Sequence, residues 1–450
     1  MQQDKSFLGT EPIGGLLFRL AVPTVVAQLV NILYNIVDRA YIGHMPQDGS
    51  LALTGLGVCM PIILVVSAFA ALVGSGGGPR ASIYMGKGDN ETAEKILGTC
   101  FTAQIVISAA LTAALLLFGR QMLLVFGASG NTIDFADAYL SIYALGTVFV
   151  QLTLGMNAFI TAQGFTKQSM STVIIGAVCN IILDPIFIFV LGMGVRGAAL
   201  ATVISQELSC IWVLRFLTGG QTVLRLRYSN LFAGADYVLP CLALGAASFI
   251  MQSTESALFV CFNSSLLRYG GDIAVGSMTI LSSVIQFAMM PLQGIAMGAQ
   301  PILSYNYGAK NYERVRSAFK LLLGVSLSFS TAIWLLVMLF PQIFAAIFTS
   351  DAELIAFTVT SLRIYLAVMF IFGIQLSCQI TFVSLGNAPC SIIVAVVRKL
   401  VLLIPLIYIL PHLVPDPTMG VYLAEPVSDF IAVSFTAILF SQQFKKALSK

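Results

Sequence analysis

The sequence predicts an all-α integral membrane protein: twelve transmembrane helices in two six-helix lobes, related by pseudo-two-fold symmetry along the membrane normal. Three observations lead to this fold class. Only 10% of the 450 residues are charged and 58% are hydrophobic, whereas soluble domains carry roughly 25% charged residues. Apolar runs of about 20 residues, long enough to cross a bilayer as a helix, recur along the chain. In addition, one loop sequence occurs twice.

Twelve apolar segments are long enough to span the membrane. No connection is long or polar enough to form a soluble domain, and the longest runs from about 220 to 236. The polar N-terminus leads directly into the first span, so we expect no cleaved signal peptide. The expected spans are 14–42, 52–77, 94–119, 134–161, 168–192, 197–219, 237–267, 273–298, 316–340, 355–385, 390–412 and 420–443.

The loop repeat has an offset of 222 residues. The segment "GGGPRASIYMGKGDNETAEK" (76–95) aligns with "GAQPILSYNYGAKNYERVRS" (298–317). A weaker match aligns "GVRGAALATVISQ", which begins at residue 194, with "GVYLAEPVSDF", which begins at residue 420. Six spans per repeat is an even number, so both halves enter the membrane in the same sense and face a central cavity, as in alternating-access transporters. We therefore expect an N-lobe at 1–219, a cytoplasmic linker at 220–236 and a C-lobe at 237–450.

The distribution of basic residues predicts the orientation. Outside the spans, all Lys and Arg residues except Arg120, Arg196 and Arg268 fall on one side of the membrane. Basic loops remain in the cytoplasm, so both termini are expected there, in a multi-pass protein of the cell (inner) membrane. The net charge of +3 is too small to indicate nucleic acid as a partner.

Two carboxylates lie inside apolar spans of the first half. Asp38 is in "NILYNIVDRAYIG" and Asp184 is in "NIILDPIFIFVLG". They lie at similar depths, about 8 and 12 Å from the outer span ends at 1.5 Å per residue. A carboxylate at mid-bilayer costs roughly 2.5–3.5 kcal/mol, and two such groups close together cannot both ionise without further cost. Each is therefore expected to be protonated, bound to a cation or paired.

Neutral oxygens are expected beside this pair. Asn180 and Tyr34 stand four residues before Asp184 and Asp38, hence on the same helix faces. Pro185 should kink its helix and free backbone carbonyls. The spans that carry Tyr139 and Thr202 bring hydroxyls to matching depth. Such a set suits a hard cation or a proton relay; the alternative is that Asp184 caps a broken helix and Asp38 pairs with Arg39.

These segments, with "AQG" (162–164) and "GVYLAEPVSD" (420–429), resemble the multidrug and toxic compound extrusion (MATE) family over essentially the whole chain, nearest its bacterial DinF- and MepA-like branch. The resemblance implies a cation-coupled antiporter for multidrug efflux. It exports amphipathic, often cationic xenobiotics in exchange for H⁺ or Na⁺, needs no cofactor, contacts membrane lipids and is a monomer by family default. Asp38, Asn180, Asp184 and Thr202 match the family's N-lobe cation site, as does Tyr139. Asn157 lies 18 residues after Tyr139 on the same expected helix, so only one of the two can reach the cation site, and the depth of Tyr139 favours Tyr139.

The family also has a pattern with a second cation site in the C-lobe. Glu255 matches its first acid, but Gln375 stands where the second is expected, so this site is incomplete by resemblance. Glu255 is then expected to bind cationic substrate or to pair with Arg398, and Glu425 is another candidate partner for Arg398. Glu207 is a further acid within a span that the pattern does not explain.

Coupling is expected to act through helix bending. A proton or Na⁺ would neutralise the Asp38–Asp184 site, and Pro23 in the first span could let that helix bend in response. Aromatic and Met side chains, abundant in this chain, suit a cavity for organic cations.

Other function classes fit the sequence less well. A flippase for lipid-linked saccharide precursors is the main alternative, but Arg398 and Lys399 are the only obvious phosphate-binding candidates. The "GKGD" string ending at Asp89 is shared with intramembrane proteases, yet it falls in a polar loop, so no enzyme is expected. No GxxxxGK[ST] string indicates ATP hydrolysis, and a channel would not need two lobes. The eight Cys form no CxxC pair and are expected to be reduced and buried, and two His residues make a His-based metal site unlikely.

Overall fold

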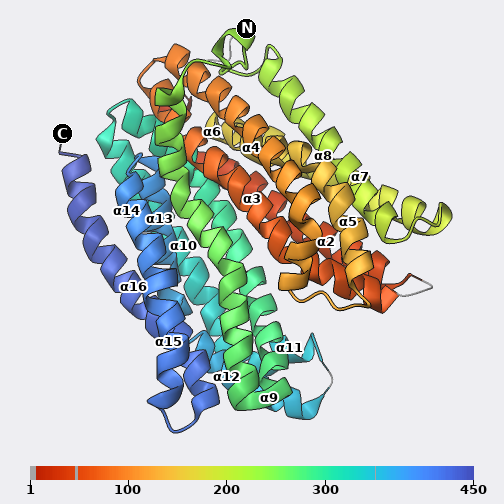
Figure 1. Cartoon of the computed structure of the whole chain (residues 1–450). Helices are drawn as coiled ribbons and strands as arrows, with labels where there is room; N and C mark the ends of the chain where they lie inside the picture. Colours follow the sequence, from red (N-terminus) through yellow and green to blue (C-terminus); the bar gives the residue numbers. More distant parts are fainter. Residues whose placement is uncertain (1–6, 46–48, 350, 450) are drawn as a thin grey trace.

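The computed structural model describes residues 7–45, 49–349 and 351–449, and within these ranges the chain is helical with no β-strand. The helices coloured red to yellow gather on one side of the molecule and those coloured green to blue on the other (Figure 1). We call α2–α8 the N-lobe and α9–α16 the C-lobe. Lys5 and Lys450, two of the basic residues used to predict the orientation, lie outside the described residues.

The N-lobe contains seven long helices and one short π-helix, preceded by a single N-terminal turn. Their bounds are α1 Phe7–Thr10, α2 Ile13–Gly43, α3 Gly49–Gly86, α4 Asn90–Val125, α5 Ile133–Leu145, α6 Thr147–Ala162, α7 Thr166–Pro185, the π-helix η1 Ile186–Val190, and α8 Val195–Thr218.

The C-lobe begins after a connection that contains the short 3₁₀-helix η2 Tyr228–Asn230. Its elements are α9 Ala235–Gly308, α10 Tyr312–Leu339, α11 Pro341–Ala346, α12 Ala352–Tyr365, η3 Met369–Ile371, α13 Phe372–Ser384, α14 Ala388–Val396, the π-helix η4 Val397–Leu403, α15 Ile404–Ile409, η5 Leu410–His412 and α16 Pro417–Ala447.

The described residues contain the predicted twelve membrane spans. Nine helices are long and apolar enough to cross a membrane, and two bent pairs, α5 with α6 and α12 with α13, qualify when each is taken as one span. α9 has 74 residues, about 111 Å at 1.5 Å per residue, which is several bilayer cores long. It reverses at Gly271, whose φ of 65° is open to glycine, so α9 supplies two spans and completes the twelve.

Two expected spans, 134–161 and 355–385, are broken rather than straight, the second by 45° between α12 and α13. The axes of α5 and α6 differ by 58°, and Gly146 lies at the break, where a Cβ atom would overlap the side chain of Val203. The close approach of α8 therefore requires glycine at this corner. From the sequence, Tyr139 and Asn157 were expected to be separated along one straight helix. Because the helix is broken between them, that distance does not apply.

The sequence repeat reappears in the contact between α3 and α9, the two helices that join the lobes. A Cβ atom on Gly86 would overlap the carbonyl oxygen of Tyr305, and one on Gly308 would overlap that of Ile83. Residues 83 and 86 become 305 and 308 on adding the offset of 222, so each half of the contact is the image of the other. The pseudo-two-fold axis therefore passes close to this contact.

The helix caps beside this contact repeat as well. The Asp89 carboxylate accepts a hydrogen bond from the Thr92 amide (3.0 Å) at the start of α4, and Asn311 accepts one from the Arg314 amide (3.4 Å) at the start of α10. The Thr92 amide also holds the pKa of Asp89 below its ordinary value because it stabilises the charged form. Asp89, the acid of the "GKGD" string, is thus an exposed cap whose repeat mate is an amide.

The connection between the lobes is bound tightly to the N-lobe. The Gln163 side-chain oxygen accepts hydrogen bonds from the amides of Val223 and Leu224, both 2.9 Å. Glu94 accepts one from the Arg225 amide and forms an ion pair with Arg227 (2.8 Å). Gln163 belongs to the "AQG" segment, whose structural role is to hold this connection.

We predict that Gly86→Ala and Gly308→Ala each lower the melting temperature of the purified protein. The added methyl group would push α3 and α9 apart, and overpacking of this kind costs roughly 1–3 kcal/mol. Gly324→Ala on α10 is the matched control: it has open space around it and should be neutral or slightly stabilising. Equal melting temperatures for all three variants would show that the α3–α9 contact is not close-packed.

Candidate cation and substrate sites

The predicted acids of the N-lobe lie together and are buried. Asp38 stands near the end of α2 and is 7% exposed, while Asp184 stands near the end of α7 and is fully buried. Their carboxyl groups are within hydrogen-bonding reach of each other. Asp184 immediately precedes Pro185 and the π-helix η1. Because proline has no backbone N–H to donate, the regular α-helix is expected to end here, beside the Asp184 carboxyl group. We call Asp38 and Asp184 the carboxyl pair.

The carboxyl pair is surrounded by neutral polar groups. The Asn180 amide donates to Asp184 Oδ1 (3.2 Å). Tyr139, 3% exposed, is within hydrogen-bonding reach of Thr202 and close to Asp38, and Tyr34 lies near both acids. The structure therefore brings together all five residues proposed from the sequence, and their role in cation binding stays a prediction.

Three acceptor oxygens at this site have no hydrogen-bond donor. Asp38 Oδ1, Asp184 Oδ2 and Asn180 Oδ1 are buried and have no hydrogen-bond partner. Among the described residues no basic side chain forms an ion pair with either acid; Arg39 is exposed and points to the Met60 sulfur (3.7 Å). Asp184 does not cap η1 either. Neither structural alternative from the sequence, the Asp38–Arg39 pair or the Asp184 cap, is observed.

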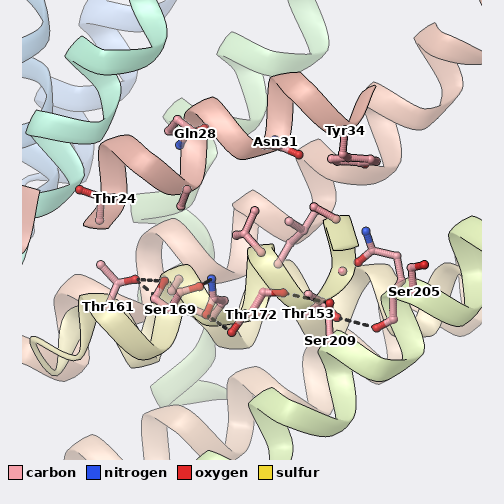
Figure 2. Close-up of a pocket in the computed structure, with 18 of the residues that line it drawn as sticks. Thr24, Gln28, Asn31, Tyr34, Thr153, Thr161, Ser169, Thr172, Ser205 and Ser209 are labelled. Atoms are coloured by element: carbon pink, nitrogen blue, oxygen red, sulfur yellow. Dashed lines mark hydrogen bonds between the residues drawn. The ribbon is translucent and has the colours of Figure 1, made fainter. Parts of the chain in front are cut away.

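A cavity of ≈ 210 Å³, lined by many uncharged polar side chains together with apolar ones, adjoins the carboxyl pair. Figure 2 shows Thr24, Gln28, Asn31 and Tyr34 on one face of α2, across the cavity from hydroxyl side chains of α6, α7 and α8. Asn180 and Thr202 line it too, so the cavity ends at the acids. Its volume holds several water molecules, and none of the described residues that line it is charged.

This cavity was not predicted from the sequence, and Asn157 was expected to lie outside the site. Asn157 lines the cavity, accepts a hydrogen bond from the Thr172 hydroxyl (3.1 Å) and donates to the Ser169 carbonyl (3.3 Å). The signal was present in the polar spacing of the spans: Thr153, Asn157 and Thr161 are four residues apart, and so are Ser205 and Ser209. That spacing places them on one helix face.

Pro23 lies inside α2, which continues through it from Ile13 to Gly43. The hydroxyl of the next residue, Thr24, donates to the carbonyls of Ala21 (2.8 Å) and of Gly294 on α9 (2.6 Å). The proline therefore sits where α2 is fastened to the C-lobe. Whether α2 bends there stays a prediction.

Five charged side chains of the C-lobe are joined by ion pairs or lie on the same helix faces, and we call them the C-lobe charge network: Glu255, Arg398, Lys399, Glu425 and Asp429. Arg398 Nε contacts Asp429 (2.7 Å) and its Nη2 contacts Glu425 (3.2 Å), whereas Lys399 Nζ contacts Glu255 (2.7 Å). The expected Arg398–Glu425 partnership is therefore present, but Glu255 pairs with Lys399 and not with Arg398. Asp429 was not predicted, although its spacing of four from Glu425 places both on one face of α16.

Helix geometry explains why both bases point inward. Arg398 and Lys399 are adjacent and would face different directions on a regular helix. They lie in the π-helix η4, and both are buried, at 7% and 6% exposed. The wider turn lets consecutive side chains enter the core, and such turns are frequent at functional sites. Arg398 also stacks over the Phe372 ring, 4.7 Å from its centroid.

Two other candidate site residues, Gln375 and Glu207, are not members of the C-lobe charge network. The Gln375 side chain is 6% exposed and its Oε1 has no partner. Glu207 is half-buried in α8.

The eight cysteines are free thiols. In the described part of the chain, no three His, Cys, Asp or Glu side chains cluster as a metal site would require, so any Na⁺ would have to rely on the carboxyl pair and neutral oxygens.

Comparisons with known proteins agree on one family. A family model described as MatE matches residues 23–186 and 247–409. The multidrug export protein MepA of Staphylococcus haemolyticus is 25% identical over 93% of this chain and 92% of its own, and that of Staphylococcus aureus is 22% identical over 89% and 87%. A solved outward-facing multidrug resistance MATE family transporter of the MOP superfamily superimposes with a TM-score of 0.91 at 21% identity, covering 100% of both chains.

We predict opposite stability effects for the two charged sites. Arg398→Met would leave two buried carboxylates without their base and should cost roughly 3–5 kcal/mol. Asp38→Asn removes a buried charge that has no basic partner and should leave the melting temperature unchanged or higher at pH 8. Thermal unfolding in detergent measures both. If Asp38→Asn lowered the melting temperature as much as Arg398→Met does, a fixed positive charge would have to stabilise the Asp38 carboxylate.

Proposed function

The chain belongs to the MatE family, and we propose that it is a secondary active antiporter that exports amphipathic, cationic organic compounds in exchange for H⁺ or Na⁺. Family membership makes it a multi-pass membrane transporter and not an enzyme. Its relatives are named multidrug export proteins, which supports drug-like compounds as the substrates here. We place it in the cell (inner) membrane as a monomer, with both termini in the cytoplasm.

The carboxyl pair carries the proposal. Two buried carboxyl groups in contact, with three unpartnered oxygens and no basic partner among the described residues, cannot both be charged in an apolar interior without a compensating cation. Among the described residues, Arg39 is the basic side chain that acts on Asp38, and it does so without an ion pair, so a mobile ion is left to compensate the charge. An ion that enters and leaves with each cycle is what coupled transport requires.

Either ion fits the side chains. A proton shared between Asp38 and Asp184 would donate to one of the unpartnered oxygens. Na⁺ would find oxygen ligands, which hard cations prefer, on Asp38, Asp184, Asn180 and Thr202. The adjoining cavity is large enough to admit water, through which either ion would reach the site, and Tyr139 would orient Thr202.

Alternating access would couple the site to the lobes. We infer that the N-lobe (1–219) and C-lobe (237–450) rotate about the α3–α9 contact, with 220–236 as the linker. Neutralising the carboxyl pair removes charge from the end of α2, and bending at Pro23 would break the Thr24–Gly294 hydrogen bond that fastens α2 to the C-lobe. Pro185 would give α7 similar freedom. Coupling ion and substrate would favour opposite states.

The flippase alternative loses its main support in the C-lobe. Binding of a pyrophosphate or sugar phosphate requires free cationic side chains, and the candidates were Arg398 and Lys399. Both are engaged by carboxylates at 2.7 Å, so neither is free for a phosphate.

We predict that ethidium efflux from cells carrying this protein stops when one ion gradient, of H⁺ or of Na⁺, is collapsed, and persists when the other is. Asp184→Asn and Asp38→Asn should abolish gradient-driven efflux at normal expression, because the site can no longer bind and release its ion. Asp134→Asn is the matched control, since its carboxylate is 79% exposed on Arg120 and should leave efflux unchanged. Efflux that ignores both gradients and both site variants would refute the antiport.

A further inference from the structure

A row of polar and glycine residues runs along the cavity face of α7. Ser169, Thr172, Gly176 and Asn180 line the cavity, and Asp184 of the carboxyl pair continues the row. The spacing of three or four residues places all of them on one helix face. From Ser169 to Asp184 the row extends over 15 residues, about 22 Å at 1.5 Å per residue. That length is most of the ~30 Å hydrocarbon core of a bilayer.

The other helices around the cavity carry polar rows at the same intervals. Figure 2 shows the row of α2 on one side of the cavity and those of α6, α7 and α8 across from it. The Ser205 hydroxyl and the Asn180 side-chain oxygen are buried and have no hydrogen-bond partner, so they are acceptors along the cavity. We call the space between these rows the N-lobe tract. Its polar lining residues on the three other helices are Thr24, Gln28, Asn31 and Tyr34; Thr153, Asn157 and Thr161; and Thr202, Ser205 and Ser209.

Hydrogen bonds between α6 and α7 lie at the end of the N-lobe tract that is remote from the carboxyl pair. The Thr161 hydroxyl donates to the Ser169 hydroxyl (2.8 Å). The Asn157 amide donates to the Ser169 carbonyl (3.3 Å), and its oxygen accepts from the Thr172 hydroxyl (3.1 Å). Thr161, Ser169 and Thr172 are buried, so these bonds hold the two helices together where the tract ends. We call these four residues the α6–α7 latch.

The α6–α7 latch lies beside the turn that holds the connection between the lobes. Residues 163–165 join α6 to α7, and Gln163 accepts hydrogen bonds from two amides of the connection, both 2.9 Å. Thr161 stands two residues before this glutamine. We place the connection in the cytoplasm, so the latch faces the cytoplasm. The carboxyl pair, near the other ends of α2 and α7, faces the outer side.

The size and chemistry of the N-lobe tract suit a small ion with its water. The cavity of ≈ 210 Å³ is smaller than the roughly 300–1,000 Å³ of pockets that bury drug-sized ligands. Its polar groups are hydroxyls and amides, and none of its described lining residues is charged. Conduction requires groups that stabilise an ion weakly enough to let it leave, and uncharged oxygens meet that requirement.

We propose that the N-lobe tract is the path by which the coupling ion leaves the carboxyl pair for the cytoplasm, and that the α6–α7 latch closes this path while the pair is loaded from outside. The ion passes between α2, α6, α7 and α8 and must part the Thr161–Ser169 bond to leave. A polar route is needed because an ion in an apolar core is costly. The inference rests on the proposed function for the identity of the ion, H⁺ or Na⁺; it does not depend on the exported compound.

Passive ion flux into proteoliposomes tests the path. The full-length protein is reconstituted without ethidium, the membrane potential is clamped with K⁺ and valinomycin, and a trapped pH indicator or ²²Na⁺ reports the flux down an imposed gradient. Thr161→Val keeps the shape of the side chain but removes its hydroxyl, and Ser169→Ala removes the other partner of the same bond. Each should raise the flux of the coupling ion roughly tenfold over the wild type, the factor expected from the loss of one buried hydrogen bond.

Three controls separate an opened latch from a damaged protein. Thr161→Ser keeps the hydroxyl and should remain as tight as the wild type. Ser171→Ala is the matched control on α7, since its hydroxyl donates to the Lys167 carbonyl of its own helix (2.9 Å), and it should not change the flux. Adding Asp38→Asn/Asp184→Asn to Thr161→Val should return the flux to the wild-type level, because the path begins at the carboxyl pair. A leak caused by misfolding would survive that addition.

The outcomes separate this inference from the antiport. Wild-type flux in both Thr161→Val and Ser169→Ala, at an unchanged melting temperature, would overturn the path, and so would a raised flux that persists without the carboxyl pair. Ethidium-driven ion counter-flow in the wild type, together with tight latch variants, would leave the antiport standing and refute the path. A latch leak that requires the carboxyl pair, in a protein without such counter-flow, would refute the antiport and leave the path standing.

Discussion

The cost of holding a carboxylate inside a membrane protein governs both charged sites of this transporter. The C-lobe meets that cost with tethered bases: Arg398 and Lys399 contact Asp429 and Glu255 at 2.7 Å. In the described part of the N-lobe no base forms an ion pair with Asp38 or Asp184, which face each other and neutral groups and leave acceptor oxygens unpartnered. Fixed charges can stabilise a fold but cannot cross the membrane. An ion-binding cycle is therefore expected at the site without its own base.

Helix irregularities place these charges. Asp184 stands where α7 gives way to the π-helix η1 at Pro185, and Arg398 and Lys399 stand in the π-helix η4, which Pro405 follows closely. Each irregularity lies in the fifth span of its repeat. The wider turns expose backbone and turn side chains that a regular helix would separate. Each repeat thus contains a π-helix in its fifth span. In the N-lobe this π-helix follows an acid, Asp184, and in the C-lobe it contains two bases, Arg398 and Lys399.

The sequence was sufficient to predict the features that depend on composition and local spacing. Hydropathy indicated twelve spans, the 222-residue repeat indicated two lobes, and Asp38 and Asp184 stood out because charges are rare in apolar runs. Features that depend on tertiary contact were missed. The 58° break at Gly146 follows from the approach of Val203, and the Glu255–Lys399 pair follows from the π-turn of η4. The polar cavity was readable in principle, since its Ser, Thr and Asn residues recur every four positions.

Measuring ion counter-flow would show whether the carboxyl pair is neutralised by an ion that moves in the direction opposite to the substrate. Proteoliposomes containing the protein would be given an ethidium gradient and no ion gradient, while a trapped pH indicator and ²²Na⁺ report ion movement. We expect one of the two ions to move opposite to ethidium, and Asp38→Asn/Asp184→Asn to abolish this movement. Ethidium transport with no accompanying flux of H⁺ or Na⁺, or a flux that survives in the double variant, would contradict it.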